Sequence, residues 1–202
     1  MAELAARRSA LAAALHAGDF GTVPASGPGI FLSERRGLAL VQLATDVESY
    51  TAAAQHIEAA LGLVLPLAPN RATVTQTLAA LWIGPARALI VGRQGEDLEQ
   101  KLAQALAGLE AALTELSHGR SVIRLEGARL RDLLAKGCGL DFHARAFAAG
   151  AALQSSYAGI NVLLHARDEP LAVDLYVGRG FAVSLWEHLL EGALEYGCRV
   201  AG

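Results

Sequence analysis

The sequence predicts an α+β domain made of two similar halves. Two pairs of matching segments indicate a duplication: "LSERRGLALVQL" from residue 32 resembles "LSHGRSVIRL" from residue 116, and "VGRQGEDLEQKL" from residue 91 resembles "VGRGFAVSLWEHL" from residue 177. The two offsets, 116 − 32 = 84 and 177 − 91 = 86, are nearly equal. Strand-like and helix-like segments follow in the same order in both halves. We therefore expect two βαββα-type layers that share one core.

The first half follows a predicted N-terminal arm and linker, residues 1–30, which contains the glycine- and proline-rich run "GTVPASGPG". Residues 37–43 have a strand pattern. The next segment, "VESYTAAAQHIEAALGL", has a helix pattern with Asp46 as a plausible N-cap and Gly62 near its C-terminus. "PLAPNRAT" is predicted to be a loop. "TLAALWIGPARALIVG" predicts two strands joined at "GPAR", and "EDLEQKLAQALAGL" predicts an amphipathic helix.

The second half repeats this order. "LTELSHG" and "SVIRLEG" have strand patterns, and "ARLRDLLAKG" predicts a short helix that buries three leucines and ends with Gly137 in a left-handed conformation. "AALQSSYAG", "NVLLHAR" and "LAVDLYVG" predict three strands, and "FAVSLWEHLLEGALEYG" predicts a closing helix. Neither half is large, so we expect a single pseudo-twofold domain over residues 31–202, with halves of about 31–110 and 111–202.

Composition excludes some classes of partner. The 202 residues include 17 basic and 20 acidic side chains, a net charge of -3, and no basic run, which argues against nucleic acid or an anionic membrane as a partner. Two cysteines without a CxxC pair fit a reducing compartment, so a cytoplasmic location is expected. Hydrophobic residues make up 53% of the chain, which indicates either a subunit interface or a bias towards alanine.

The stretch "SHGRSVIRLEGARLRDLLAKGCGLDFHARAF" contains residue types that catalyse reactions, but not in catalytic patterns. His118 and His143 are 25 residues apart and no HExxH occurs, so no metal site is predicted. Cys138 has no neighbouring base and follows a helix, which favours a buried structural thiol. The loops "VGRQGE" and "VGRGF" match neither GxGxxG nor a P-loop. We predict no catalytic, cofactor-binding or metal residue in this chain.

The arginines of this stretch could hold an anion or pair with acidic residues of a partner. Arg129 and Arg131 are expected on a solvated helix face. For Arg120 and Arg145 we expect a structural or interface role. The predicted interface residues are Ser117, His118, Arg120, Asp141, His143 and Arg145.

The same stretch resembles the signature region of the gamma subunit of heterotetrameric sarcosine oxidase. "RRSAL", "LSERRGLALVQL", "PNR", "ALWIGP" and "FAVSLWEHLLEGALEYG" occur in the order expected for that family, so the resemblance covers most of the chain. The chain departs from the family pattern at Gly139, where the family often has proline. Alanines at 144, 148 and 149 also stand near positions where the family often has proline.

The resemblance implies a fold like the folate-binding domain of the glycine-cleavage aminomethyltransferase. It implies a non-catalytic structural and assembly subunit of a complex that oxidatively demethylates sarcosine to glycine. FAD, FMN, NAD, zinc and tetrahydrofolate are then expected in partner subunits, with alpha, beta and delta subunits as partners and no cofactor in this chain. Two alternatives stay open: a stand-alone folate-binding protein of one-carbon metabolism, and the same subunit in a related complex such as an N-methylglutamate dehydrogenase.

Overall fold

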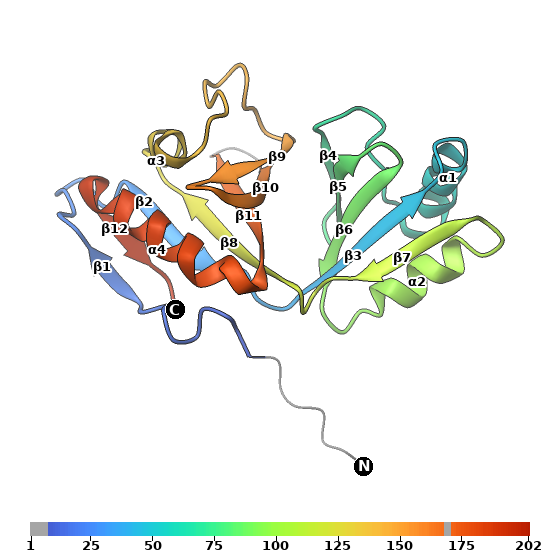
Figure 1. Ribbon diagram of the computed structural model, residues 1–202, viewed down its shortest axis with the longest axis horizontal. Helices are drawn as coiled ribbons and strands as arrows, with labels where there is room; N and C mark the ends of the chain where they lie inside the picture. Colours follow the sequence, from blue (N-terminus) through green and yellow to red (C-terminus); the bar gives the residue numbers. More distant parts are fainter. Residues whose placement is uncertain (1–7, 168–170) are drawn as a thin grey trace, which may run out of the picture.

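Two β-sheets face each other and helices cover their outer sides in the computed structural model, which describes residues 8–167 and 171–202 (Figure 1). Sheet A has the strand order β1-β12-β2-β8-β11-β10-β9, and sheet B has the order β4-β5-β6-β3-β7. Neighbouring strands are antiparallel except β12 and β2, which are parallel.

The strands of sheet A are β1 (Gly18–Phe20), β2 (Ile30–Glu34), β8 (Arg120–Glu126), β9 (Ala152–Tyr157), β10 (Ile160–Ala166), β11 (Ala172–Gly178) and β12 (Cys198–Val200). The strands of sheet B are β3 (Leu38–Thr45), β4 (Ala72–Val74), β5 (Ala79–Gly84), β6 (Arg87–Arg93) and β7 (Ala111–Glu115). The α-helices are α1 (Ser49–Leu61), α2 (Leu98–Ala105), α3 (Leu130–Gly137) and α4 (Ala182–Ala193). Single 3-10 turns, Arg179–Phe181 and Leu194–Tyr196, flank α4.

Three apolar clusters hold these layers together. Helices α3 and α4 pack on the outer face of sheet A, and α1 and α2 pack on the outer face of sheet B. A third cluster lies between the sheets and is built from alternate residues of the inner strands. Its members include Leu40 of β3, Leu81 of β5, Leu89 of β6, Val122 of β8 and Tyr176 of β11. The inner faces of both sheets therefore form one continuous core.

The two halves have the same topology, which confirms a duplicated α+β fold. The series β3-α1-β4-β5-β6-α2-β7 matches β8-α3-β9-β10-β11-α4-β12. The strand orders also match, except that sheet A has β2 inserted between β8 and β12 and β1 added at its edge. The offset of 84 residues relates β3 to β8, and the offset of 86 relates β6 to β11. Each half has more strands than the βαββα pattern, because very short strands such as β4 lie in segments that read as loops.

The chain crosses between the sheets twice, after β2 and after β7. The two crossings lie side by side: the Leu40 amide donates to Ser117 Oγ at 2.8 Å, and the Leu116 amide donates to the Leu40 carbonyl at 2.8 Å. Strand β1, in the predicted arm, pairs with β12, while β2 belongs to sheet A and β7 to sheet B. The division into an arm, one domain and two halves stays a prediction.

The glycines at the C-terminal ends of α1 and α3 have different backbone conformations. Asp46 accepts a hydrogen bond from the Ser49 amide at 2.7 Å at the start of α1, and Gly62 ends that helix with a φ of 65°. The expectation that Gly137 is left-handed was wrong, because Gly137 is the last helical residue of α3. A Cβ at this position would lie 2.6 Å from the Tyr157 ring, so glycine is needed here for close approach and not for a positive φ.

Within the described ranges, no helix combines the length and the apolar character that crossing a membrane requires.

Candidate functional site

A buried ion cluster lies at one end of the layer between the sheets. Asp174 of β11 is fully buried. It accepts hydrogen bonds from Arg124 Nε at 2.8 Å, from Arg124 Nη2 at 3.0 Å and from Arg35 Nη1 at 2.8 Å. Burial acts to raise the pKa of this carboxyl, but the hydrogen bonds and charges of the two guanidinium groups hold it below its ordinary value. Asp174 is therefore ionised and fully engaged, which is a structural role.

His165 and Tyr176 are buried beside this cluster. His165 of β10 lies opposite Asp174 in the sheet register. Neither ring nitrogen of His165 nor the Tyr176 hydroxyl has a hydrogen-bond partner among the described residues. Burial lowers the pKa of His165 to about 4, with Arg167 as the next cause, so the imidazole is neutral near pH 7. Burial also raises the pKa of Tyr176. These groups carry a desolvation cost that the fold tolerates.

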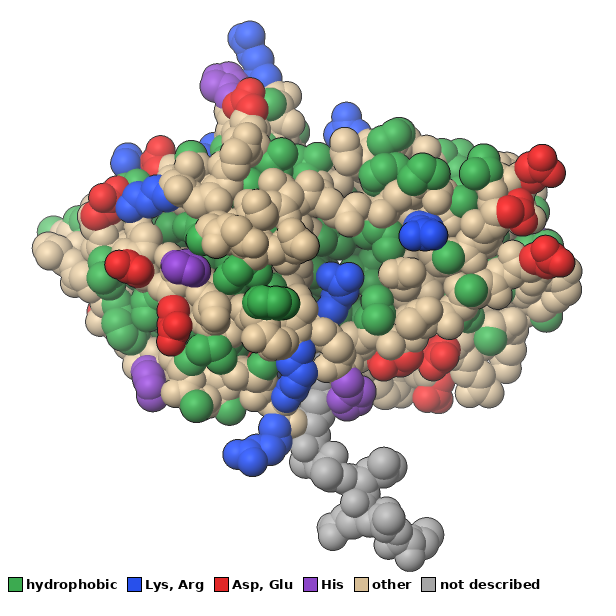
Figure 2. Space-filling model, in the orientation of Figure 1, with side chains coloured by type: hydrophobic (Ala, Val, Ile, Leu, Met, Phe, Trp, Pro, Cys, Tyr) green, Lys and Arg blue, Asp and Glu red, His purple; other side chains and the backbone are tan. Residues whose placement is uncertain are grey.

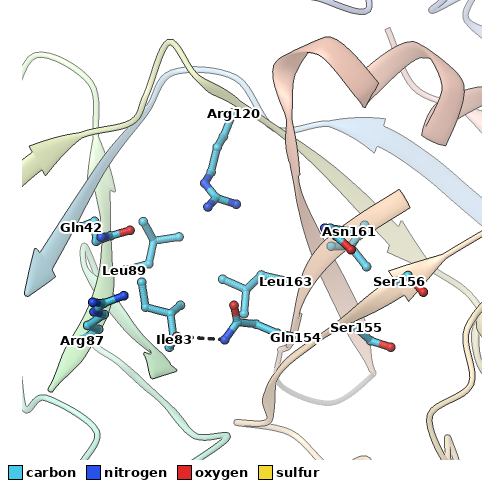
Figure 3. A pocket seen from close by; sticks show the side chains of 11 residues that line it. Gln42, Ile83, Arg87, Leu89, Arg120, Gln154, Ser155, Ser156, Asn161 and Leu163 are labelled. Carbon is cyan, nitrogen blue, oxygen red and sulfur yellow. Dashed lines mark hydrogen bonds between the residues drawn. The ribbon is translucent and has the colours of Figure 1, made fainter. Parts of the chain in front are cut away.

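A cleft of about 750 Å³ opens at the other end of the same layer, where the sheets diverge. Figure 2 shows the centre of this face hollowed between the sheets, with basic and hydrophobic side chains around it. In Figure 3 the Arg120 side chain points into the space between the walls. The lining residues are Gln42, Ile83, Arg87, Leu89, Arg120, Gln154, Ser155, Ser156, Asn161, Val162 and Leu163. Gln154 Nε2 of sheet A donates to the Ile83 carbonyl of sheet B at 3.0 Å, which links the walls.

Half of the predicted interface residues lie in the connection between β7 and β8. Ser117 is buried and holds the two sheet crossings together through its hydrogen bond with Leu40. His118 is exposed on the turn. Arg120 begins β8 and is half-buried at the cleft, where burial lowers its pKa. This group therefore sits at the junction of the sheets.

The other predicted residues lie in the loop 138–150 above sheet A (Figure 1). Asp141, His143 and Arg145 are all exposed. Asp141 Oδ1 accepts the His143 amide at 2.8 Å, so Asp141 shapes the loop after the helix. The structure does not bring these three residues together with the residues of the β7–β8 turn. They form a second, separate group.

The expectation that Arg131 is solvated was wrong. Arg131 Nη1 donates to the carbonyls of Phe142 at 2.6 Å and Phe147 at 2.9 Å, because the loop folds back over α3. The Phe142 and Phe147 rings pack edge to face with centroids 5.1 Å apart. Arg129, in contrast, is exposed and pairs with Asp132 at 3.0 Å. Arg131 thus fixes the loop that presents Asp141, His143 and Arg145.

The remaining candidates from the sequence have structural surroundings. Cys138 is buried, and its thiol donates to Ser155 Oγ at 3.4 Å. The loops "VGRQGE" and "VGRGF" occupy equivalent places between β6 and α2 and between β11 and α4. In residues 8–167 and 171–202 no group of three or more His, Cys, Asp or Glu side chains could hold a metal ion.

Reasoning from the sequence missed the buried cluster and the cleft. The available signal was a polar residue inside each apolar run: His165 in "NVLLHAR" and Asp174 in "LAVDLYVG". Both strands were predicted, but the pairing of Asp174 with Arg124 depends on sheet register between β8 and β11, and the pairing with Arg35 depends on the insertion of β2.

Comparisons with known proteins agree with this architecture. The chain superposes on a chain of the heterotetrameric sarcosine oxidase of Corynebacterium sp. U-96 with a TM-score of 0.82, 29% identity, and coverage of 94% of this chain and 96% of that one. It also superposes on the glycine cleavage system aminomethyltransferase T of Bartonella henselae with a TM-score of 0.62, covering 87% of this chain and 48% of that one. At 16% identity, the second match shows a shared fold.

Sequence comparisons give the family. The chain is 37% identical over 109 residues to the sarcosine oxidase subunit gamma of Arthrobacter sp., a match that covers 54% of each chain. It is 36% identical over 109 residues to the subunit of the same name from Corynebacterium sp. (strain U-96), covering 54% of this chain and 53% of that one. The matched region thus spans about half the length of these curated relatives. The model of the sarcosine oxidase, gamma subunit family matches residues 44–195. The chain belongs to the sarcosine oxidase, gamma subunit family.

Proposed function

We propose that this chain is the non-catalytic gamma subunit of a heterotetrameric sarcosine oxidase, an oxidoreductase that demethylates sarcosine to glycine. The observation that carries the proposal is the superposition on a chain of the oxidase from Corynebacterium sp. U-96, which covers 94% of this chain. Its partners are then the alpha, beta and delta subunits, in the cytoplasm. FAD, FMN, NAD, zinc and tetrahydrofolate are bound by those partners.

The placement of the charged residues supports a role in assembly. Asp174 is fully buried and accepts hydrogen bonds from Arg35 and Arg124, whose side chains are 29% and 24% exposed. The exposed candidates form two surface groups, at the β7–β8 turn and on the loop 138–150. An arginine-fixed loop presents the second group in one conformation, which suits a permanent contact. We propose that His118, Arg120, Asp141, His143 and Arg145 contact partner subunits, and that Ser117 positions the junction behind them.

The alternative of a stand-alone folate-binding protein rests on the fold shared with the aminomethyltransferase. A pterin ring stacks on apolar or aromatic surfaces and offers amino and ring N–H groups to an acceptor. The residues that line the cleft include no aromatic ring and no carboxylate, although Gln42, Gln154 and Asn161 could accept. This lining favours the assembly role. A related complex, such as an N-methylglutamate dehydrogenase, is a third possibility that differs only in the partner's substrate.

Co-expression with the alpha, beta and delta subunits tests the proposal. We expect one soluble complex by light scattering and, for the isolated chain, self-association and no flavin absorbance band. Arg145→Glu should reduce the yield of complex at least about fivefold, whereas the control Lys101→Glu on α2 should leave it within about twofold. His118→Ala and His143→Ala should leave turnover of the assembled enzyme within about threefold. A monodisperse monomer that ignores the other subunits, or binds folate, would favour the stand-alone alternative.

A further inference from the structure

Strand β8 carries two arginines on the same face whose surroundings differ. Arg120 and Arg124 are four residues apart, so both side chains face sheet B, about 13 Å from each other along the strand. The register with β11 places Asp174 opposite Arg124 but Gly178 opposite Arg120. Arg124 therefore has a carboxylate at the cross-strand position, and Arg120 has no side chain there. The half-buried guanidinium of Arg120 also has no hydrogen bond or ion pair within the described part of the chain.

The cleft into which Arg120 points has the electrostatics of an anion site. A second guanidinium, that of Arg87 on β6, stands on the opposite wall and also lacks an acidic partner among the described residues (Figure 3). The 11 lining residues include two arginines and no aspartate or glutamate. The chain has a net charge of -3, so the positive charge of the cleft comes from where its arginines are placed and not from the overall composition. Its volume lies in the range of small-molecule sites.

The neighbouring surface indicates what accompanies the anion. Arg120 also borders a smaller depression of about 410 Å³, whose lining includes Leu116, Ile160 and Phe181. Phe181 is 63% exposed, the highest value among the large hydrophobic residues of sheet A and its helices. A ligand that places its acid group on Arg120 can thus cover apolar surface on one side and reach amide groups on the other. Gln42 and Asn161 provide such amides.

We propose that the cleft between the two sheets binds a carboxylate group through Arg120, with Arg87 as a second cation on the opposite wall. All of its lining residues come from strands, so the anion is bound by side chains, chiefly the guanidinium groups. A planar guanidinium pairs with a planar carboxylate through two parallel hydrogen bonds. A helix N-terminus, the common backbone site for phosphate, does not contribute to the lining. The carboxylate can belong to a free organic acid or to an acidic side chain of a partner polypeptide.

Binding to the full-length chain can be measured by NMR that observes the ligand, which does not require a monomeric protein, with succinate as the probe and succinamide as its neutral isostere. We expect succinamide to bind at least about tenfold more weakly. Arg120→Gln should weaken succinate binding about tenfold or more, and Arg87→Gln by a smaller factor. Arg93→Gln is the matched control, because Arg93 lies on the same strand and face as Arg87 but outside the cleft. Its affinity should stay within about twofold.

A variant that adds a carboxylate beside Arg120 tests the site without removing Arg120 itself. Gly178 has a φ of -57°, and a Cβ there would meet Phe181 at an ordinary 3.7 Å, so side chains are tolerated. Gly178→Asp supplies at Arg120 the carboxylate that Asp174 supplies at Arg124. It should abolish succinate binding while the fold is kept, and Gly178→Ala should not. If Arg120→Gln fails to fold, this pair of variants still decides the outcome.

The source of the carboxylate is decided by two further arms. A blocked Ala-Leu-Glu-Leu-Ala peptide, with its Gln version as control, represents a partner segment. Inorganic phosphate tests whether the site prefers a carboxylate to another anion. If succinate still binds to the assembled complex, the site takes a free acid. If assembly blocks succinate binding and Gly178→Asp weakens assembly, the carboxylate comes from a partner subunit. Only this outcome depends on the proposed function. Equal binding of succinate and succinamide, unchanged affinity in Arg120→Gln, tighter binding of phosphate, or no binding by any probe would each overturn the proposal.

Discussion

The layer between the sheets has a closed end with an ion cluster and an open end with a cleft, and β8 contributes one arginine to each. At the closed end Arg35 and Arg124 share the buried carboxylate of Asp174. At the open end Arg87 and Arg120 face a cleft with no acidic lining residue. Both ends present arginines, and they differ in one internal carboxylate. Where it is present, the arginines form an ion cluster that stabilises the fold; where it is absent, they are available to another molecule. The register of β8 with β11 decides which arginine receives it.

The largest effect is expected at the closed end. Asp174→Asn leaves two guanidinium groups, whose side chains are 29% and 24% exposed, without a counter-charge, and we expect a loss of about 3 kcal/mol in the free energy of unfolding. Urea unfolding of the wild type and the variant measures it. The control is Asp132→Asn, which breaks the exposed ion pair with Arg129 and removes an acid from the first turn of α3, and should cost less than about 1 kcal/mol. Similar losses in both variants would refute the distinction between buried and exposed pairs.

The second effect is a pH dependence that comes from His165. Its pKa falls from 6.5 to about 4 on folding, so the unfolded chain binds the proton more readily between these values. Stability is therefore present above about pH 6.5 and is lost as the pH falls towards 4. Linkage gives a loss of about 2 kcal/mol between pH 7 and pH 5. Urea unfolding at a series of pH values should show this loss in the wild type and in His143→Gln, but not in His165→Leu. An unchanged slope in His165→Leu would assign the effect elsewhere.

A smaller effect of opposite sign is expected at the open end. Arg120→Gln removes a half-buried charge that has no partner among the described residues, so the variant should be as stable as the wild type or up to about 1 kcal/mol more stable. Arg124→Gln should destabilise, because it removes two hydrogen bonds to Asp174. Thermal unfolding of both variants under one set of conditions gives the comparison. Clear destabilisation by Arg120→Gln would mean that Arg120 holds the fold, and the two ends would no longer differ.

The smallest effect concerns the link across the cleft. Gln154→Ala removes the hydrogen bond from an exposed side chain to the Ile83 carbonyl, and should cost about 0.5–1 kcal/mol. Ser156→Ala is the control, because Ser156 lies on the same strand and face and lines the cleft, but has no hydrogen bond to sheet B among the described residues. Urea unfolding measures both. A cost above about 2 kcal/mol for Gln154→Ala would show that the cleft depends on this single bond for its shape.

Local patterns predicted the long elements and failed at the short ones. Strands such as β6 and β11 have apolar runs between clear turns, and α1 has both its Asp46 contact and its Gly62 end. Strands β1, β4 and β12 have three residues each. Strands β1 and β12 exist because β12 pairs with β1 and β2 from the other end of the chain, a cause that no local window contains, whereas β4 pairs with the nearby β5.

The site was predictable only in part for a related reason. Ser117, His118 and Arg120 were selected from residue type and resemblance, and they do lie at the junction of the sheets. The cleft itself depends on which positions face inward in both sheets and on Gly178 standing opposite Arg120. Arg131 was misread because its hydrogen-bond acceptors, the carbonyls of Phe142 and Phe147, are backbone groups of a loop whose path the sequence does not specify.

The strand order of sheet A governs how the chain can acquire its structure during synthesis. Sheet B uses one contiguous segment, from Leu38 to Glu115, and can form as soon as that segment leaves the ribosome. Sheet A must instead join β1 and β2 to β12, whose residues emerge last. Pairing over such separations is slow. Until β8 to β11 have formed, the inner face of sheet B, with Leu40, Leu81 and Leu89, has no cover. A nascent chain with an uncovered apolar sheet is a natural client for chaperones until β8 to β11 fold over it.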